Sequence, residues 1–339
     1  MSVFNVALIG CGGFVRHTHL ANLNRHARFQ IHAAVDVNPD AAQRVAEAGG
    51  AAYWTDDADR AISDPAVDVV FIATPHHNHA DLTIRAARAG KHIYCEKPMG
   101  LTEAECQAAA AAVRESGVKY VLGYNRALAP FSLQARDLLA SLDEPMLICY
   151  RFADWNPYGT SWMIDEKLSG GRVIGEGCHA LDLLCRFVGQ DPVRLYAEGG
   201  NLAAPSPTGA PDSAAITLGF PNGSAAVLYL SSVGNNACPK EEIQITCNNH
   251  TVVIYGFERM AVYAPDGEKS FSLPAVDKGH WALLDEAASV FAGEAEPSVG
   301  VAEGCAAPGS RSLPSRRFER TGCTPSRLRA TRGDLHCVS

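Results

Sequence analysis

The chain lacks the features of several protein classes. Its 339 residues contain no run of about 18 consecutive apolar residues, which a membrane-spanning helix needs. The N-terminus, MSVFNVALIG, has neither the basic flank nor the cleavage site of a secretory signal. We therefore expect a cytoplasmic protein with no membrane partner.

Basic charge is also scarce. The formal net charge is -8, and nucleic acids bind to basic faces, so we expect no nucleic-acid partner. The end of the chain is an exception, because residues from 301 onward include seven arginines, three acidic residues and no lysine. The segment 305–339 is rich in Arg, Ser, Pro and Gly and has no apolar stripe. We interpret this segment as a disordered basic tail or as a frameshifted reading of the final helix. The alternative interpretation is an unusual extension of a protein with ordinary function.

Cysteine is present but has no pattern. The eleven cysteines include no CxxC pair, so the sequence supports neither a zinc ribbon nor a disulfide framework. His76, His77 and His79 lie close together but lack the spacing of a catalytic zinc site, and we predict no metal. The composition, 47% hydrophobic and 19% charged, suits a globular protein that is long enough for two domains.

Apolar strand-like runs alternate with amphipathic helical segments over residues 1–122. The runs are almost continuously apolar, which is typical of a parallel sheet covered on both faces. One of the helices begins with a capping box formed by Thr102 and Glu105 and ends at Gly117. The fold class is therefore α/β, with an N-terminal doubly wound parallel sheet. Its strands are expected at 3–9, 30–36, 67–74, 91–96 and 118–124.

The pattern changes after residue 122. A helix over about 129–141, a strand over 146–152, a loop rich in Trp, Tyr and Gly, and a helix from Cys178 come first. Six consecutive strands then follow between residues 193 and 264, and turn pairs such as PNG and NN indicate antiparallel hairpins. With a closing helix over 279–293, these features predict an α+β domain, residues 123–304, with a large, mainly antiparallel open sheet.

The stretch GCGGFV joins the first strand to the first helix. Glycines there let the backbone approach a pyrophosphate, whose charge the helix N-terminus meets. The third glycine of the usual fingerprint is replaced by Val15, and a plain structural turn is the alternative interpretation. Asp36 ends the second strand, where a carboxylate would accept hydrogen bonds from ribose hydroxyls and repel a 2′-phosphate, so NAD is favoured over NADP. The predicted cofactor residues here are Gly10, Cys11, Gly12, Gly13, Phe14, Val15, Asp36 and Val37.

Two further stretches carry candidate catalytic groups. HIYCEKPMG places Glu96, Lys97 and Pro98 at a strand end, which suits an ammonium group held at a cleft. SGGRVIGEGCHALDLLCRFVG places His179 and Asp182 where they can share one face of a helix start. An imidazole can move a proton near neutral pH, although a histidine with a structural role is the more common outcome for such a position alone.

Together, GCGGF with Asp36, ATPHHNHADLTIRAARAGKHIYCEKPM, GYNR and GGRVIGEGCHALDLL resemble the glucose-fructose oxidoreductase / inositol dehydrogenase / MocA (Gfo/Idh/MocA) family over residues 3 to about 303. The resemblance implies a Rossmann domain and a C-terminal domain whose open sheet forms homo-oligomer interfaces. It also implies hydride transfer between NAD(P) and a sugar, inositol or nucleotide-sugar carbon. A redox catalyst of glycoside cleavage with bound NAD, and a non-catalytic dinucleotide sensor, are the alternatives.

The resemblance also assigns roles to individual residues. Lys97 is implied to lie beside the nicotinamide and the substrate hydroxyl, and His179 to be the catalytic base, with an acid limb of the rate profile near pH 6 to 7. Gly175 stands where most relatives carry an aspartate, and the adjacent Glu176 is the candidate replacement. A cis peptide bond before Pro98 is implied as well. The other implied cofactor residues are Thr74, Pro75, His79, Glu96 and Asn125, and the implied substrate residues besides Lys97 and His179 are Arg126 and Trp162.

Trp155, Tyr158 and Trp162 have two interpretations. Their rings suit a platform on which a sugar stacks, and they suit equally the packing of a long loop.

Overall fold

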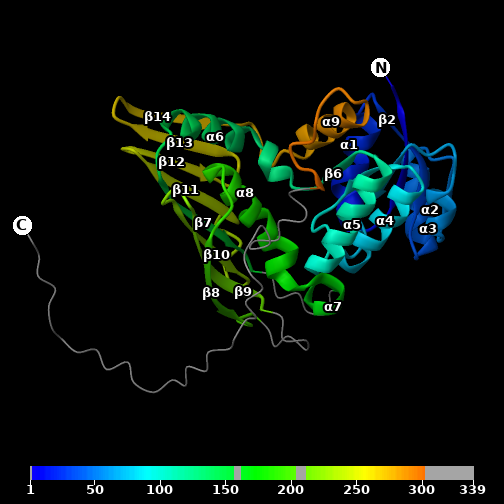
Figure 1. Cartoon of the computed structure of the whole chain (residues 1–339), viewed down its shortest axis with the longest axis horizontal. Coiled ribbons are helices and arrows are strands. Elements are labelled where there is room, and N and C mark those ends of the chain that lie inside the picture. Colours follow the sequence, from blue (N-terminus) through cyan, green and yellow to red (C-terminus); the bar gives the residue numbers. More distant parts are fainter. Residues whose placement is uncertain (1, 156–161, 204–210, 302–339) are drawn as a thin grey trace, which may run out of the picture.

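The computed structural model describes residues 2–155, 162–203 and 211–301 and folds into two halves, one around each of two sheets (Figure 1). The predicted tail, residues 305–339, and Tyr158 lie outside the described residues.

The first half is a six-stranded parallel sheet in the order β3-β2-β1-β4-β5-β6. The predicted parallel sheet is confirmed, with β3 as an additional strand at its edge. Successive side chains of a strand pack on opposite faces of the sheet. In β1, Val6 and Leu8 belong to one core, and Ala7 and Ile9 belong to the other. The strands are β1 (Phe4–Ile9), β2 (Phe29–Val35), β3 (Tyr53–Thr55), β4 (Val69–Ile72), β5 (His92–Cys95) and β6 (Tyr120–Leu122). The helices are α1 (Leu20–Arg25), α2 (Pro39–Gly49), α3 (Ala58–Ile62), α4 (His79–Arg88) and α5 (Glu103–Ser116), with the shorter turns η1 (Val15–His19) and η2 (His76–Asn78).

Local sequence signals set the helix ends in this half. The capping box of α5 is confirmed, since Thr102 accepts from the Glu105 amide and the Glu105 side chain accepts from the Thr102 amide. Gly117 ends the same helix in the left-handed conformation, at φ 68°. In α2 the left-handed residue is Gly50, with φ 65°. Gly49, the last residue of the helix, is needed for packing, because a Cβ there would lie 2.8 Å from Ile31.

The second half is an eight-stranded sheet in the order β14-β13-β12-β11-β7-β10-β9-β8. Every pairing is antiparallel except that of β7 with β10, so the predicted mainly antiparallel sheet is confirmed. Its strands are β7 (Met146–Ala153), β8 (Arg194–Gly200), β9 (Ser213–Gly219), β10 (Ala225–Ser231), β11 (Glu241–Cys247), β12 (His250–Tyr255), β13 (Arg259–Ala264) and β14 (Gly267–Ser272). The other elements of this half are η3 (Asn125–Leu128), α6 (Pro130–Leu142), η4 (Trp162–Ile164), α7 (Glu166–Ser169), η5 (Val173–Gly177) and α8 (Cys178–Val188).

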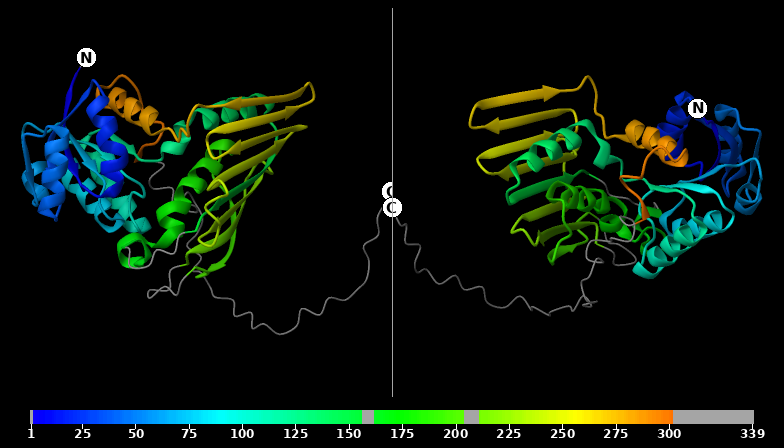
Figure 2. Two further views of the ribbon diagram at one scale, coloured as in Figure 1. Left: turned by 180° about the vertical axis from the view of Figure 1, so that it is seen from behind. Right: turned by 45° about the horizontal axis from the view of Figure 1, so that its top comes forward.

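Among the described residues, helices cover one face of the large sheet and leave the other uncovered. Side chains of α6 and α8 pack on the face turned toward the first half, where they form one core with Ile148 and Tyr150 of β7 (Figure 2). On the other face Leu147 and Cys149 of the same strand are exposed, and no described element covers them.

The last helix, α9 (His280–Phe291), packs on the first half rather than on the second. The sequence placed it in the second domain, but its residues Leu283, Ala287 and Phe291 share a core with β1 and β2. The chain continues along the same sheet, where the Leu122 amide donates to the Val299 carbonyl oxygen at 3.0 Å. Within the described residues, no helix is both long and apolar enough to cross a membrane.

Candidate active site

The glycine loop lies where the strand order of the first sheet reverses, between β1 and β4. Gly10 has φ +97°, and a Cβ there would lie 2.5 Å from the Ala73 carbonyl oxygen, so only glycine fits. A Cβ on Gly12 or Gly13 would meet nothing within 4 Å, so the outer side of the loop is open. Crevices at such reversal points bind dinucleotides, and this loop leaves room for one.

Asp36, directly after β2, lies at the base of this loop. Its carboxylate accepts hydrogen bonds from the backbone amides of Cys11 at 2.7 Å and Asn38 at 2.8 Å. The side chain of Val37 is 92% exposed and that of Phe14 is 47% exposed, whereas Val15 is buried. Burial raises the pKa of the Cys11 thiol to about 12, so this cysteine is not a nucleophile at neutral pH.

His79 joins two of the loops at the carboxyl edge of the sheet. Its Nδ1 lies 2.7 Å from the Pro98 carbonyl oxygen, and its Nε2 lies 2.9 Å from the Thr74 carbonyl oxygen. The Thr74 hydroxyl donates to the Pro75 carbonyl oxygen. His79 was predicted at a cofactor position, and in the structure it fixes the backbone of that position. Across the described ranges, no group of three or more His, Cys, Asp or Glu side chains has the arrangement of a metal site.

Glu96, directly after β5, is buried beside His19. The His19 Nε2 lies 2.8 Å from Oε1 of Glu96. Burial raises the pKa of Glu96, but the hydrogen bond from His19 and the charges of His19 and Lys97 outweigh it and hold the pKa below its usual value. Gly123 makes room for this side chain, since a Cβ there would lie 2.8 Å from Oε2 of Glu96.

Lys97 connects the two halves of the molecule. Its Nζ donates to the carbonyl oxygen of Gly175 at 2.6 Å, and the Lys97–Pro98 peptide bond is cis, as the resemblance implied. No carboxylate in the described part of the chain lies within ion-pair distance of this ammonium. Its positive charge is therefore available to a partner that is not part of the protein.

His179 lies in the first turn of α8, four residues after Gly175, and is buried. Its Nδ1 has no hydrogen-bond partner among the described residues, and its ring meets Tyr124 edge to face at 5.9 Å between centroids. Asp182, expected on the same face, instead accepts from Arg186 at 2.8 Å.

The surroundings of His179 are positively charged. Burial, followed by the charges of Arg126 and Lys97, holds the pKa of His179 well below its usual value. The imidazole is therefore neutral at pH 7 and can accept a proton. If His179 is the base, we therefore expect its acid limb below the range of pH 6 to 7 that was expected from the sequence.

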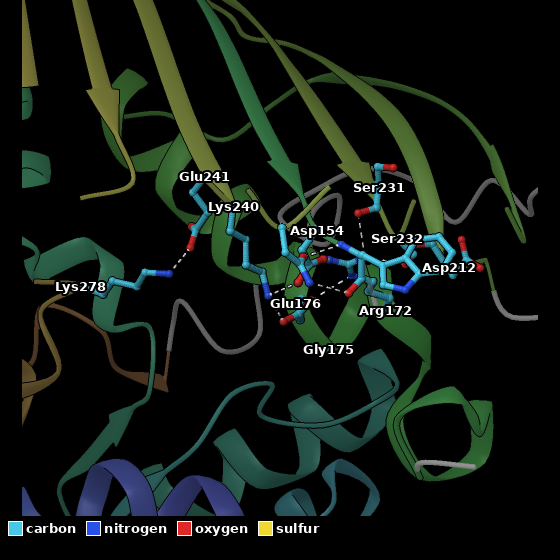
Figure 3. Close-up of polar contacts among 12 residues, drawn as sticks. Asp154, Arg172, Gly175, Glu176, Asp212, Ser231, Ser232, Lys240, Glu241 and Lys278 are labelled. Atoms are coloured by element: carbon cyan, nitrogen blue, oxygen red, sulfur yellow. Dashed lines mark hydrogen bonds and ion pairs between the residues drawn. The ribbon is translucent and has the colours of Figure 1, made fainter. Parts of the chain in front are cut away.

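Glu176 belongs to a closed cluster of charges at the end of β7, shown in Figure 3. It accepts from Arg172 Nε at 2.9 Å and from Lys240 Nζ at 2.8 Å, and both cations also pair with Asp154. Burial raises the pKa of Glu176, but Lys240 and Arg172 outweigh it and lower the pKa to about 2. Because Arg172 and Lys240 each bind one oxygen of this carboxylate, the geometry favours a positioning role over the catalytic role predicted. In this position Glu176 anchors the turn that presents the Gly175 carbonyl.

Arg126 is not at an open rim, where the resemblance placed it. It is buried and donates through Nε and Nη2 to Glu241 at 2.7 and 2.8 Å. Lys278 and the Tyr150 hydroxyl donate to the same carboxylate at 2.6 and 2.5 Å. Asn125 likewise donates internally, to the Lys278 carbonyl oxygen at 2.7 Å. Sequence reasoning missed Glu241 and Lys278, since neither stands in a motif.

The two described tryptophans of the loop differ in their surroundings. Trp162 is 37% exposed, and its ring meets that of His76 edge to face at 4.9 Å between centroids. Trp155 is 53% exposed and forms an isolated bridge with Val233. His76, considered in the sequence only as a metal ligand, therefore lies beside a predicted substrate residue.

Comparisons with known proteins identify the family of the chain. The model of the oxidoreductase family with the NAD-binding Rossmann fold matches residues 4–124, and that of the GFO/IDH/MocA C-terminal domain matches residues 133–256. Levoglucosan dehydrogenase of Pseudarthrobacter phenanthrenivorans is 32% identical over 205 residues, 56% of this chain and 52% of that protein. Inositol 2-dehydrogenase of Rhizobium meliloti is 30% identical over 225 residues, 65% of this chain and 66% of that protein. The chain thus spans between about half and two thirds of the length of these curated relatives.

The fold is shared with solved structures. A levoglucosan dehydrogenase in complex with NADH and levoglucosan superimposes with a TM-score of 0.80 at 22% identity, over 90% of this chain and 94% of that one. The two family models match in chain order and together span more than half of the sequence. The protein belongs to the GFO/IDH/MocA family of NAD-binding oxidoreductases.

Proposed function

We propose that the protein is an NAD-dependent oxidoreductase that oxidises a hydroxyl-bearing carbon of a sugar or polyol. One observation carries this proposal. The Lys97 ammonium, which has no carboxylate partner among the described residues, is held by the Gly175 carbonyl, and Gly175 lies four positions before the buried, neutral imidazole of His179. These are the two groups that a reacting alcohol needs, a hydrogen-bond donor for its oxygen and an acceptor for its proton.

NAD fits the first half of the chain. The glycine loop would hold the pyrophosphate, Asp36 the ribose, and the strand ends at Thr74 and Glu96 would flank the nicotinamide. When bound, NAD supplies the hydride acceptor. The Asp36 carboxylate disfavours a 2′-phosphate, and neither Val37 nor Asn38 offers a cation for one, so NADP is the less favoured cofactor.

The residues of the chain handle the proton and the charge. His179 takes the hydroxyl proton, since a sugar hydroxyl is too weak an acid to ionise at pH 7, and a positioned base is worth about 10² to 10⁴ in rate. Lys97 donates a hydrogen bond to the same oxygen and stabilises its developing negative charge. The Gly175 carbonyl, anchored through Glu176, keeps the ammonium in place before the substrate arrives.

The position of the acid limb tests the role of His179. A base with a lowered pKa stays neutral as pH falls from 8. Its ability to accept a proton is lost only when pH falls through that lowered pKa. We therefore expect kcat/KM of the wild type to stay level as pH falls through 6.5, the usual pKa of histidine, and to fall only at lower pH. His179→Gln should remove this limb, because glutamine does not titrate. A wild-type limb centred at pH 6.5 or above, or the same limb in the variant, would count against the assignment.

The uncovered face of the large sheet supports self-association. Its exposed side chains include Leu147, Tyr196 and Tyr229, which the strand register places on the same face of three strands. An uncovered sheet face that exposes large apolar side chains is typical of a subunit interface. We expect light scattering to give the mass of a dimer or a tetramer, and a monomer at all concentrations would refute this part of the proposal.

The function is tested by following absorbance at 340 nm with inositols, aldoses and nucleotide sugars, first with NAD and then with NADP. Accumulation of NADH with at least one of them is the expected result. Binding of NAD without net reduction in the presence of any of them would instead favour the redox catalyst of glycoside cleavage or the dinucleotide sensor.

A further inference from the structure

His76 lies against the same residue that holds Lys97. It follows β4 in the turn η2 and is buried. A Cβ on Gly175 would lie 2.9 Å from Cε1 of His76, so the imidazole packs directly on the Gly175 backbone. The Lys97 ammonium donates to the carbonyl oxygen of that residue at 2.6 Å. The imidazole and the ammonium thus converge on one residue.

The tautomer of His76 follows from its partner. Its Nδ1 lies 2.8 Å from the Ser169 carbonyl oxygen, which can only accept, so Nδ1 carries the proton. Burial and the Lys97 charge lower the pKa of His76 to about 3, so the ring is neutral at physiological pH. Its Nε2 then presents a lone pair, and no described residue donates to it.

An aromatic surface lies beside His76. The Trp162 ring meets the His76 ring at 4.9 Å and 89°, with 37% of Trp162 still exposed. Pockets for small polar ligands combine apolar surface with a few placed hydrogen-bonding atoms, and both are present here.

We propose that Nε2 of His76 accepts a hydrogen bond from a second hydroxyl of the substrate, on the carbon next to the one that is oxidised. The inference rests on the proposed function and narrows its substrate class to vicinal diols, such as those of sugars and cyclitols, rather than isolated alcohols. The His76 ring and the Lys97 ammonium both approach Gly175, and we infer that one substrate reaches both groups through hydroxyls on adjacent carbons. His76 is then a specificity residue, and His179 remains the base.

Two variants separate this role from a structural one. In His76→Asn the amide nitrogen can still donate to the Ser169 carbonyl oxygen, but nothing replaces Nε2. In His76→Gln the longer amide reaches the position of Nε2. With myo-inositol, D-glucose and levoglucosan as probes, we expect His76→Asn to raise KM at least tenfold, with kcat and the NAD Kd changed less than threefold. In His76→Gln the KM should return part of the way to the wild-type value. An unchanged KM in His76→Asn, with a probe that reacts, would overturn the inference but leave the proposed function intact.

A second measurement does not depend on turnover. In histidine-labelled protein with NADH bound, ¹⁵N NMR should show the His76 resonances, assigned by their loss in His76→Asn, as the neutral tautomer protonated at Nδ1. At least one of the three probes should shift the Nε2 resonance. A ring protonated at Nε2, or no shift with any probe, would refute the role of His76. Failure of every sugar and inositol to reduce NAD would refute the proposed function itself.

Discussion

Lys97→Met should lower kcat/KM at least about 100-fold, the cost of losing one donor to a developing oxyanion. Methionine keeps the length of the side chain and removes the charge and the donor. The NAD Kd should change less than about threefold, because the glycine loop and Asp36 are untouched. Steady-state rates at 340 nm and titration with NAD measure the two quantities separately.

Lys91 provides the matched control. It precedes β5, whereas Lys97 follows it, and its Nζ also donates to backbone carbonyl oxygens, those of Asp64 at 2.8 Å and Val67 at 2.7 Å. It therefore makes the same type of contact at the opposite end of the same strand. Lys91→Met should leave kcat/KM within about twofold of wild type. Retention of more than a tenth of the activity in Lys97→Met would contradict a role worth about 1.4 kcal/mol or more in the barrier.

Glu241→Gln should lower the free energy of unfolding by about 3 to 5 kcal/mol, the usual cost of removing one partner from a buried ion pair. The Glu241 side chain is 1% exposed and accepts from Arg126 and Lys278. Removal of its charge leaves the buried Arg126 and the partly buried Lys278 without a counter-ion. Burial raises the pKa of Glu241, but Arg126 and Lys278 outweigh it and lower the pKa to about 2, so the carboxylate is ionised in the native protein.

Glu242, the next residue of β11, is the control for that variant. Its carboxylate is 3.6 Å from Arg151, and the side chains of Glu242 and Arg151 are 38% and 24% exposed. A long, partly exposed pair of this kind contributes about 0 to 1 kcal/mol. Glu242→Gln should therefore unfold at nearly the wild-type urea concentration. If the two variants lose equal stability, the ion pairs of Glu241 with Arg126 and Lys278 do not hold η3 against the large sheet.

Most of the fold could be predicted because its signals are local. The buried strands of the first sheet read as apolar runs, and the capping box of Thr102 and Glu105 marks a helix start within four residues. The missed strands lack such signals. Residues 267–272 of β14 are almost entirely exposed at the sheet edge, and Tyr53–Thr55 of β3 are only three residues.

The site was harder to predict because its decisive contacts are long range. The resemblance named Lys97 and His179, but the partner of Lys97 is a backbone carbonyl 78 positions away, which no motif can show. Arg126 was predicted to contact substrate, yet it is satisfied by Glu241, 115 positions later. Glu176 carries a charge in the right region and is nevertheless occupied by Lys240 and Arg172. A motif identifies a charged residue, but it does not show which group that residue pairs with in the folded protein.

The most direct test of the account is a crystal structure of the protein with NADH and the sugar or inositol that reacts fastest. The account predicts that one alcohol oxygen lies within hydrogen-bonding distance of both the Lys97 ammonium and a ring nitrogen of His179. A substrate bound with its reacting oxygen in contact with neither group would contradict it.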